Sequence, residues 1–360
     1  MKTLIIYNEN ISTQTLSYQV GWIKAFKKNT LFHCDYLNLN NFFPTRKKIP
    51  KIKELKYLLF KKYDCIILLH STFSNACLVP FYVQKILREK NAFKVFFIGN
   101  EYKHMPEKIK FVKYLKINLF ITQSHQEEVI NLYKKELNIF VEHITNTGID
   151  EEIFYPKIDY KKRLSVIGYR TGPDPLYFGK QERINLFYFL KNYSSTNKKY
   201  NFDVSIDVND RFNYLDWPDF INRCKCMFAS NTGFDYFFLN DDIRNKVNQS
   251  KLKNIDEIFN TFFLNITNGT KFRCVTGKTI EPAACKTPLI QVEGDYDKFK
   301  SNIHYIPLNE DYSNIDECLE KLEDNLYINS IIENSYKLVK SEYLYRHLIN
   351  KLYNNVKKNF

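Results

Sequence analysis

The stretch Thr276-Gly-Lys-Thr-Ile-Glu-Pro-Ala-Ala-Cys-Lys-Thr-Pro-Leu-Ile290 decides the fold of this 360-residue chain. It predicts a loop that enters a short helix and leaves into a buried strand, with Glu281 at the helix start. A helix start carries unpaired N–H groups and a partial positive charge, so Lys278, Thr279 and the neighbouring backbone suit a phosphate-bearing ligand. The Glu281 carboxylate can accept hydrogen bonds from hydroxyl groups of the same ligand. Capping of the helix is the alternative role for Glu281.

The same stretch resembles the nucleotide-binding segment of the group-1 glycosyltransferases, in particular the family 4-like branch related to spore-coat maturation proteins. That segment typically reads Arg-x-x-Glu-Ala-x-Ala-Cys-Gly-x-Pro-x-Ile, and the chain reads Lys278-x-x-Glu281-Pro-Ala-Ala-Cys285-Lys-Thr-Pro288-Leu-Ile290. Three departures from the family pattern matter: Lys278 replaces Arg, Lys286 replaces Gly, and Arg273 replaces an earlier Glu. The resemblance implies a hexosyltransferase-type enzyme that moves a sugar from a nucleotide-sugar donor to a glycan or lipid-linked saccharide acceptor.

Short apolar strand candidates alternate with amphipathic helical stretches along both halves of the chain. The candidate strands are 4–7, 34–39, 65–69, 94–98, 118–122 and 140–144, then 164–168, 203–206, 225–229 and 288–292. This alternation is typical of parallel sheets covered by helices on both faces. The sequence therefore predicts an α/β protein with two Rossmann-like doubly wound domains facing a cleft, an architecture that the resemblance identifies as GT-B-like.

The alternation breaks at a turn-rich connector, Asn146-Thr-Gly-Ile-Asp-Glu-Glu-Ile-Phe-Tyr-Pro156, which resembles the interdomain segment of the same family. We expect an acceptor-side domain, the connector, a nucleotide-sugar domain and a C-terminal helix crossing back to the first domain, over 1–146, 147–162, 163–335 and 336–360. Within the nucleotide-sugar domain, 231–271 lacks clean periodicity and is predicted to be a mainly helical insertion.

Candidate site residues follow predicted strands, because ligands of open α/β sheets bind beyond the carboxyl ends of the strands. In the second domain Arg170 follows a strand, and Lys180 and Arg183 come at the next helix start. The resemblance implies that such a basic turn holds the donor diphosphate. In the first domain His70 and Glu101 follow strands and are catalytic candidates that bind or activate the acceptor. Solvated basic side chains and a hydrogen-bonded structural histidine are the alternatives.

The net charge of +13 is concentrated in the first half of the chain. Residues 1–150 hold 23 Lys and Arg against 12 Asp and Glu, a net charge of +11. Its densest part is 46–62, in which apolar residues recur at helical spacing between lysines, at Ile52, Leu55, Leu58 and Leu59. This predicts an amphipathic helix that either packs on the core with a solvated lysine face or makes peripheral contact with an anionic membrane.

Several classes of protein are disfavoured by the sequence. Its eight cysteines lack the spacing of a zinc site or a secreted disulfide framework, and the N-terminus reads as a first strand, so we expect a cytoplasmic protein. No apolar run is long enough to span a bilayer. We expect no cofactor and no metal, because helix N-termini and basic side chains can neutralise a leaving diphosphate. We also expect no nucleic-acid partner, because no such motif appears.

Two alternatives to the glycosyltransferase interpretation stay open. A non-catalytic basic protein that binds a polyanion or a membrane would explain the charge of the first half. A fucosyltransferase-like enzyme of the same architecture is suggested by Val275-Thr-Gly-Lys278, which resembles a Val/Ile-Thr-Glu-Lys signature with Gly277 in place of Glu. Whether transfer would retain or invert the anomeric centre is also open at this point.

Overall fold

The computed structural model describes residues 1–9, 17–41, 57–267 and 269–360, and its contacts divide the chain into two compact units. The first unit contains 1–146, 237–242 and 346–360, and the second contains 147–236 and 243–345. Within the described ranges, no helix is long and apolar enough to cross a membrane. Most of the basic segment 46–62 lies outside the described residues, and its described end has helical residues at 57–60.

The first unit is built on a six-stranded, wholly parallel sheet in the order β2-β1-β3-β4-β5-β6. Its strands are β1 (Lys2–Tyr7), β2 (His33–Asn38), β3 (Cys65–Leu68), β4 (Phe93–Phe97), β5 (Leu119–Thr122) and β6 (Phe140–His143). Every residue of β3, β4 and β5 is buried. Runs of Ile, Leu, Val and Phe form these strands because a parallel sheet is covered on both faces.

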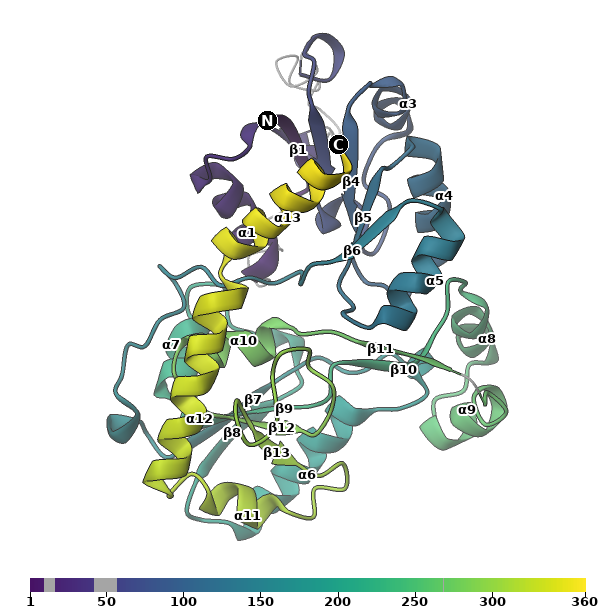
Figure 1. Ribbon diagram of the computed structural model, residues 1–360. Coiled ribbons are helices and arrows are strands. Elements are labelled where there is room, and N and C mark those ends of the chain that lie inside the picture. Colours follow the sequence, from purple (N-terminus) through teal and green to yellow (C-terminus); the bar gives the residue numbers. More distant parts are fainter. Residues whose placement is uncertain (10–16, 42–56, 268) are drawn as a thin grey trace. The chain divides into compact units, whose positions relative to one another are not determined.

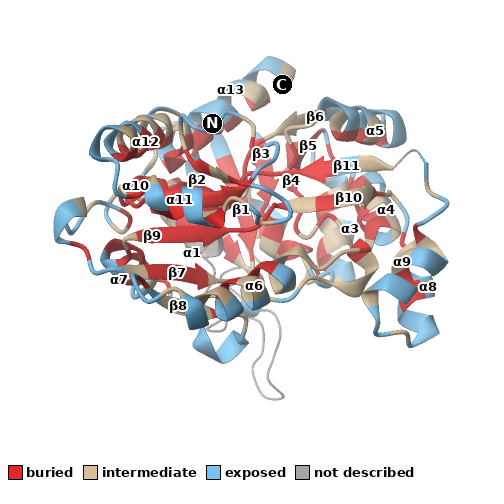
Figure 2. Ribbon diagram, turned by 90° about the horizontal axis from the view of Figure 1, so that it is seen from below, coloured by how far each residue is buried: buried red, intermediate tan, exposed pale blue. Residues whose placement is uncertain are grey.

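Helices flank the sheet of the first unit (Figure 1). They are α1 (Ser17–Lys28), α3 (Phe81–Glu89), α4 (Met105–Leu115), α5 (Glu127–Leu137) and α13 (Tyr345–Asn359). Each connects or covers parallel strands with its apolar face inward, as the buried strands and more exposed helices of Figure 2 show. In α3, for example, Val83 and Leu87 are buried four positions apart.

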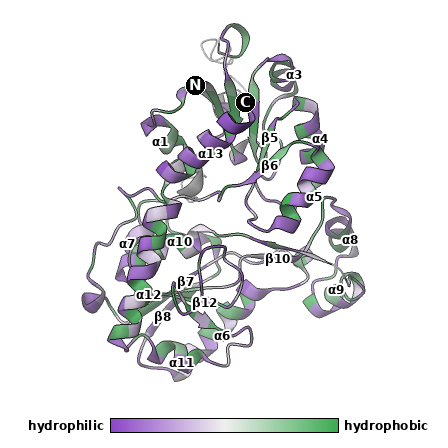
Figure 3. Ribbon diagram, viewed as in Figure 1, coloured by the Kyte–Doolittle hydropathy of each residue, from purple (hydrophilic) through white to green (hydrophobic). Residues whose placement is uncertain are grey.

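The second unit repeats this plan with a five-stranded parallel sheet in the order β13-β12-β9-β7-β8. Its strands are β7 (Val166–Arg170), β8 (Asn201–Ser205), β9 (Cys226–Ala229), β12 (Leu289–Val292) and β13 (Ile306–Leu308). Strands β9 and β12 are fully buried, while the edge strand β8 is mostly half-buried. The hydropathy colouring of Figure 3 shows the apolar residues of both units concentrated in the strands and on inner helix faces.

The helices of the second unit pack on the faces of this sheet. They are α6 (Glu182–Thr196), α7 (Trp217–Arg223), α10 (Gly277–Ala284), α11 (Ile315–Glu320) and α12 (Asn325–Leu338), with a π-helical turn at Val339–Tyr343. One buried cluster joins sheet and helices through Leu186 and Leu190 of α6, Ile290 of β12 and Ile328 of α12. The order of strand, helix and strand around this core is that of a Rossmann-like domain.

The region 231–271 is less helical than predicted. It contains α8 (Asp242–Ser250) and α9 (Ile255–Phe262), but also β10 (Gly233–Phe237) and β11 (Thr270–Arg273), which pair as a separate two-stranded sheet. Its helices share a small core of Val247, Ile258 and Phe263. The ribbon was missed because Asp235 and Arg273 interrupt its apolar pattern, and these two side chains pair with each other across the ribbon.

The α/β class and the doubly wound organisation are confirmed. All ten predicted strands exist, each within two residues of its predicted ends at most. The short helix of the 276–290 stretch is also present as α10, followed by β12. One detail is corrected: α10 begins at Gly277, so Glu281 lies one turn inside the helix and not at its start.

Gly168 tests how tightly β7 packs in the second unit. A Cβ atom there would lie 2.5 Å from the Met227 sulfur, 2.8 Å from the Cys224 sulfur and 3.0 Å from the Phe220 ring. These neighbours are buried, so Gly168→Ala should lower the free energy of unfolding by about 1–3 kcal/mol, the usual cost of overpacking. Denaturant unfolding measures this loss.

Gly172→Ala is the matched control for that measurement. Its new Cβ would meet only the guanidinium end of the exposed Arg211, at 2.6 Å, which can move aside. The free energy of unfolding should therefore change by less than about 0.5 kcal/mol. Equal stability of the two variants would contradict the packing described for β7.

Candidate functional site

The start of α10 presents polar groups that have no partner among the residues that the structure describes. Thr276 is the N-cap residue, but its side chain makes no capping hydrogen bond, and its buried hydroxyl has no partner in the described part of the chain. The amides of Thr279 and Ile280 both bond to the Thr276 carbonyl. The amides of Gly277 and Lys278, the first two of the helix, have no hydrogen-bond partner within the described ranges, so they are the donors that a bound anion would use.

Glu281 folds back over this helix start. Its carboxylate accepts a hydrogen bond of 2.7 Å from the indole nitrogen of Trp217 on α7, and the residue is 4% exposed. A Cβ atom on Gly277 would lie 2.7 Å from the Glu281 carboxylate oxygen, so glycine is what allows the approach. Trp217 in turn stacks on Phe220, with ring centroids 5.5 Å apart. The carboxylate is therefore fixed one turn behind the open amides.

Three cationic side chains gather around the same helix start. Lys278 donates a hydrogen bond to the hydroxyl of Thr171, in the loop that follows β7. Burial, together with the charges of Arg183 and Arg211, lowers the pKa of Lys278 well below its usual value, against the opposing carboxylates of Asp174 and Glu281. Three cations thus face two carboxylates. A bound anion would relieve the repulsion between them.

Two of these cations, one from α6 and one from the segment after β8, contact the loop that follows β7. Arg183 pairs with Asp174 at 3.1 Å, and the Arg183 amide donates to the same carboxylate at 2.7 Å. The Arg211 guanidinium lies over Gly172, where a Cβ atom would be 2.6 Å from it. The basic turn therefore lies against α10, as parallel topology requires when strand ends and helix starts share one edge of a sheet.

Arg170 and Lys180 have other partners. Arg170 forms an ion pair with Asp203 of β8, donates to the Asp203 carbonyl at 2.6 Å, and lies 4.9 Å from the centre of the Phe220 ring. Lys180 pairs with Glu182 and, at 2.7 Å, with Asp235 of β10. Both side chains are engaged in ion pairs within the second unit, and their predicted contact with a diphosphate stays a prediction.

Thr279 and Arg273 are also turned away from a ligand. The Thr279 side chain is fully buried, and its hydroxyl lies 3.4 Å from the side-chain oxygen of Gln291 on β12. Its burial favours a structural role, and its predicted phosphate contact stays a prediction. Arg273, at the position where the resembled family carries an earlier Glu, pairs with Asp235 and donates to the Phe234 carbonyl at 2.9 Å. Arg273 therefore links β11 to β10 within the two-stranded ribbon.

In the first unit His70 lies directly after β3, in a short turn at His70–Thr72. It is 3% exposed, and its ring centre is 6.2 Å from that of Phe97. Burial lowers the pKa of His70 to about 3, against a hydrogen bond with the Asn146 backbone. Its imidazole is neutral at physiological pH, and its burial favours a structural role. Its assignment as a catalyst stays a prediction.

Glu101 lies after β4 and is 2% exposed. Its carboxylate accepts three hydrogen bonds of 2.7 Å, from the Thr122 hydroxyl, the Gln123 amide and the Tyr133 hydroxyl. Burial raises the pKa of Glu101 to about 7, although these donors oppose the shift. Three donors from β5, its following loop and α5 fit an internal anchor, and its catalytic role also stays a prediction.

The raised pKa of Glu101 makes stability depend on pH. Between pH 4.5 and about 7 the unfolded chain releases this proton while the folded chain keeps it, so the free energy of unfolding should fall as pH rises. The total change should reach at most about 3 kcal/mol. Glu101→Gln should flatten this part of the curve in denaturant titrations, whereas Glu136→Gln, on an exposed carboxylate, should not. A slope that survives Glu101→Gln would refute the assignment.

The sequence analysis did not find all residues of the cluster. Thr171, Asp174 and Gly172 follow a predicted strand, so their position was a usable signal. Arg211 and Trp217 come from a loop and a helix with no motif of their own. They reach α10 only through the tertiary fold.

No protein-family model and no curated protein matches the chain. Solved structures do resemble it. HepE of Anabaena in complex with UDP and glucose has a TM-score of 0.53 at 9% identity, covering 99% of this chain and 100% of that one. T4 phage BGT in complex with UDP-glucose has a TM-score of 0.52 at 14% identity, covering 100% of this chain and 99% of that one. The N-terminal domain of Candida albicans trehalose-6-phosphate phosphatase has a TM-score of 0.51 at 11% identity, covering 99% of this chain and 96% of that one. At these identities the likeness establishes the fold, two Rossmann-like domains of the GT-B type.

Proposed function

We propose that the protein is a glycosyltransferase that takes its sugar from a nucleotide-sugar donor. The observation that carries the proposal is the start of α10, where two open amides and Lys278 meet Arg183 and Arg211 beside the fixed carboxylate of Glu281. A nucleoside diphosphate has the matching parts: two phosphates for the cations and amides, and ribose hydroxyls for the carboxylate.

The proposed chemistry is stabilisation of the leaving group. When the bond from the sugar to the diphosphate breaks, negative charge grows on the phosphate oxygens. Cations and backbone amides that are already in place lower the energy of this transition state without reorganising. Glu281 has the complementary task of holding the ribose, so that the diphosphate stays against the cations. This division of roles retains Lys278, Arg183 and Glu281 from the sequence analysis and adds Arg211.

A UDP-sugar is the first donor to test, and the acceptor we propose is a glycan or a lipid-linked saccharide. Two structures of the same fold, HepE and T4 BGT, are complexes with UDP and glucose or with UDP-glucose. Contact with an anionic membrane is part of the proposal for the acceptor. It is supported by the described end of the basic segment, where Leu59 and Phe60 are 49% and 80% exposed beside Lys61 and Lys62.

The direct test is hydrolysis of a panel of nucleotide sugars by the purified chain, together with binding of the corresponding nucleoside diphosphates. Slow release of sugar from one donor, and binding of its diphosphate, are expected. The alternative of a basic polyanion-binding protein predicts the opposite pattern: binding of any polyanion, lost with salt, and no preference for a nucleoside diphosphate. That pattern would overturn the enzyme assignment.

Glu281→Gln tests the ribose contact. Loss of a hydrogen bond to a charged group should weaken UDP binding by about 1.5–3 kcal/mol in titration calorimetry. The amide keeps an oxygen for the Trp217 N–H, so the fold should persist and circular dichroism should be unchanged. Glu310→Gln, on an exposed carboxylate, serves as the control and should bind as the wild type does. Wild-type affinity in Glu281→Gln would remove Glu281 from the ribose.

Lys278→Ala and Arg170→Ala should separate catalysis from stability. Lys278→Ala removes a proposed diphosphate contact and should slow sugar release about 100-fold, the scale of losing one preorganised donor. Arg170→Ala removes one of the two arginines that pair with Asp203, leaving Arg223, and should instead lower the melting temperature. Donor turnover per folded molecule and thermal unfolding measure both effects. Slower turnover in Arg170→Ala at unchanged stability would return Arg170 to the diphosphate site.

A further inference from the structure

A group of metal-ligating side chains lies in the first unit, at the start of α4. His104, Glu107 and Asp241 each offer one ligand atom, and these atoms all lie within 4.8 Å of one another. Among the residues in the described ranges, it is the one group of three side chains with this property. Asp241 comes from the segment 237–242, and it is 137 positions away from His104 in the sequence.

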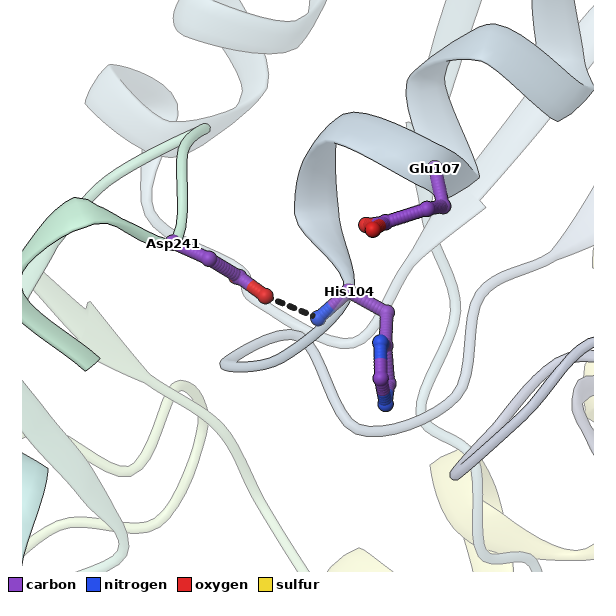
Figure 4. A group of neighbouring side chains, drawn as sticks. All are labelled: His104, Glu107 and Asp241. Atoms are coloured by element: carbon purple, nitrogen blue, oxygen red, sulfur yellow. Dashed lines mark hydrogen bonds between the residues drawn. The ribbon is translucent and has the colours of Figure 1, made fainter. Parts of the chain in front are cut away.

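Asp241 is fixed by the turn that opens α4. Its carboxylate accepts hydrogen bonds from the His104 amide at 2.7 Å and from the Met105 amide at 3.3 Å. Figure 4 shows Asp241 reaching the His104 backbone from a neighbouring segment, while Glu107 projects from α4 and the imidazole extends from the same turn. Asp241 is 7% exposed.

The other two ligands have room to adjust. His104 is half-buried and Glu107 is exposed, so rotation of either side chain does not disturb the core. Metal–ligand bonds of about 2.1 Å place two ligand atoms at most about 4.2 Å apart. The three ligand atoms lie within 4.8 Å of one another, slightly more than this span, so a small adjustment of His104 and Glu107 is enough.

The local charge favours a cation at this place. Glu107 and Asp241 contribute two negative charges, which exceed the partial positive charge of about one half at a helix start. The nearby ammonium of Lys108 is directed into the turn, where it donates to the carbonyls of Gly99, Asn100 and Lys103 at 2.6–2.9 Å. The Lys108 ammonium is thus bonded to carbonyl groups of the turn.

We propose that His104, Glu107 and Asp241 bind a divalent first-row transition metal ion, with water completing its coordination. One imidazole and two carboxylates form a ligand set suited to Zn²⁺, Co²⁺ or Mn²⁺, whereas Mg²⁺ prefers an all-oxygen set. The metal would tie segment 237–242 to α4 and close a loop of the chain. It is independent of the proposed sugar transfer, and it departs from the sequence-based expectation of no metal.

The test is metal binding by the full chain, purified without a polyhistidine tag and stripped with a chelator. Titration with Co²⁺, followed by visible absorption, should give one saturable site, and Zn²⁺ should displace the Co²⁺. Bound Zn²⁺ should raise the melting temperature, because it binds only the folded chain. Mg²⁺ at the same concentration should do neither.

Three variants locate the site. His104→Ala and Glu107→Ala should each weaken Co²⁺ binding at least tenfold, and Asp241→Asn should do the same while its amide oxygen still accepts from the α4 turn. His33→Ala, which removes an exposed imidazole elsewhere in the unit, should bind as the wild type does. The proposal is overturned if the wild type shows no saturable site, or if the His104 and Glu107 variants bind Co²⁺ with unchanged affinity.

Discussion

The constraint on which this structure depends is that parallel strands must be covered on both faces. Both sheets are wholly parallel, and their central strands are buried throughout. Parallel neighbours can be joined only by a crossover, usually a helix that starts near the carboxyl edge of the sheet. That edge therefore collects helix starts and loops, whose unpaired amides need partners. The starts of α10 and α4 both follow this rule, but their amides obtain partners in different ways.

At α4 the chain satisfies its own amides. Asp241 arrives from a distant segment and accepts from the His104 and Met105 amides, a role that an N-cap side chain often fills locally. At α10 the N-cap Thr276 does not fill this role, although its side chain is of a suitable type. A helix start that retains open amides next to three cations is electrostatically unfavourable without an anion. This contrast is the physical reason for placing the donor diphosphate at α10.

Burial of charge explains which basic residues are left for a ligand. In the second unit most buried cations have partners: Arg163 bonds to the Thr287 hydroxyl and to the Cys285 carbonyl at 2.7 Å, and Arg170 pairs with Asp203. Asp235 serves both Lys180 and Arg273. Around Lys278 the cations Lys278, Arg183 and Arg211 outnumber the two carboxylates that influence it, those of Asp174 and Glu281. A buried charge without a partner costs much free energy. The excess of cations around Lys278 therefore points to a ligand, whereas an arginine that already has a partner does not.

The fold could be predicted from the sequence because its signal is local. Runs of Ile, Val, Leu and Phe mark each buried parallel strand, and the 276–290 stretch marks a helix between a loop and a strand. The site was predicted only in part. Glu281, Lys278 and Arg183 lie in the cluster, but Thr279 points into the core and Arg170 pairs across to β8. An arginine at the end of one strand can face a ligand or can pair with an Asp in the neighbouring strand. Arg170 pairs with Asp203 of β8, and no local sequence pattern reveals that pairing.

The lysine at position 278 gives the α10 cluster a property that the arginine of the resembled family would not. A guanidinium keeps its charge under all ordinary conditions, whereas an ammonium can release its proton when burial and neighbouring cations disfavour the charge. The lowered pKa of Lys278 has those two causes, with Arg183 and Arg211 as the neighbours. An anion held beside Lys278 opposes both causes of the shift, because its negative charge stabilises the ammonium. A diphosphate in the proposed site would therefore raise the pKa of Lys278 back towards its usual value.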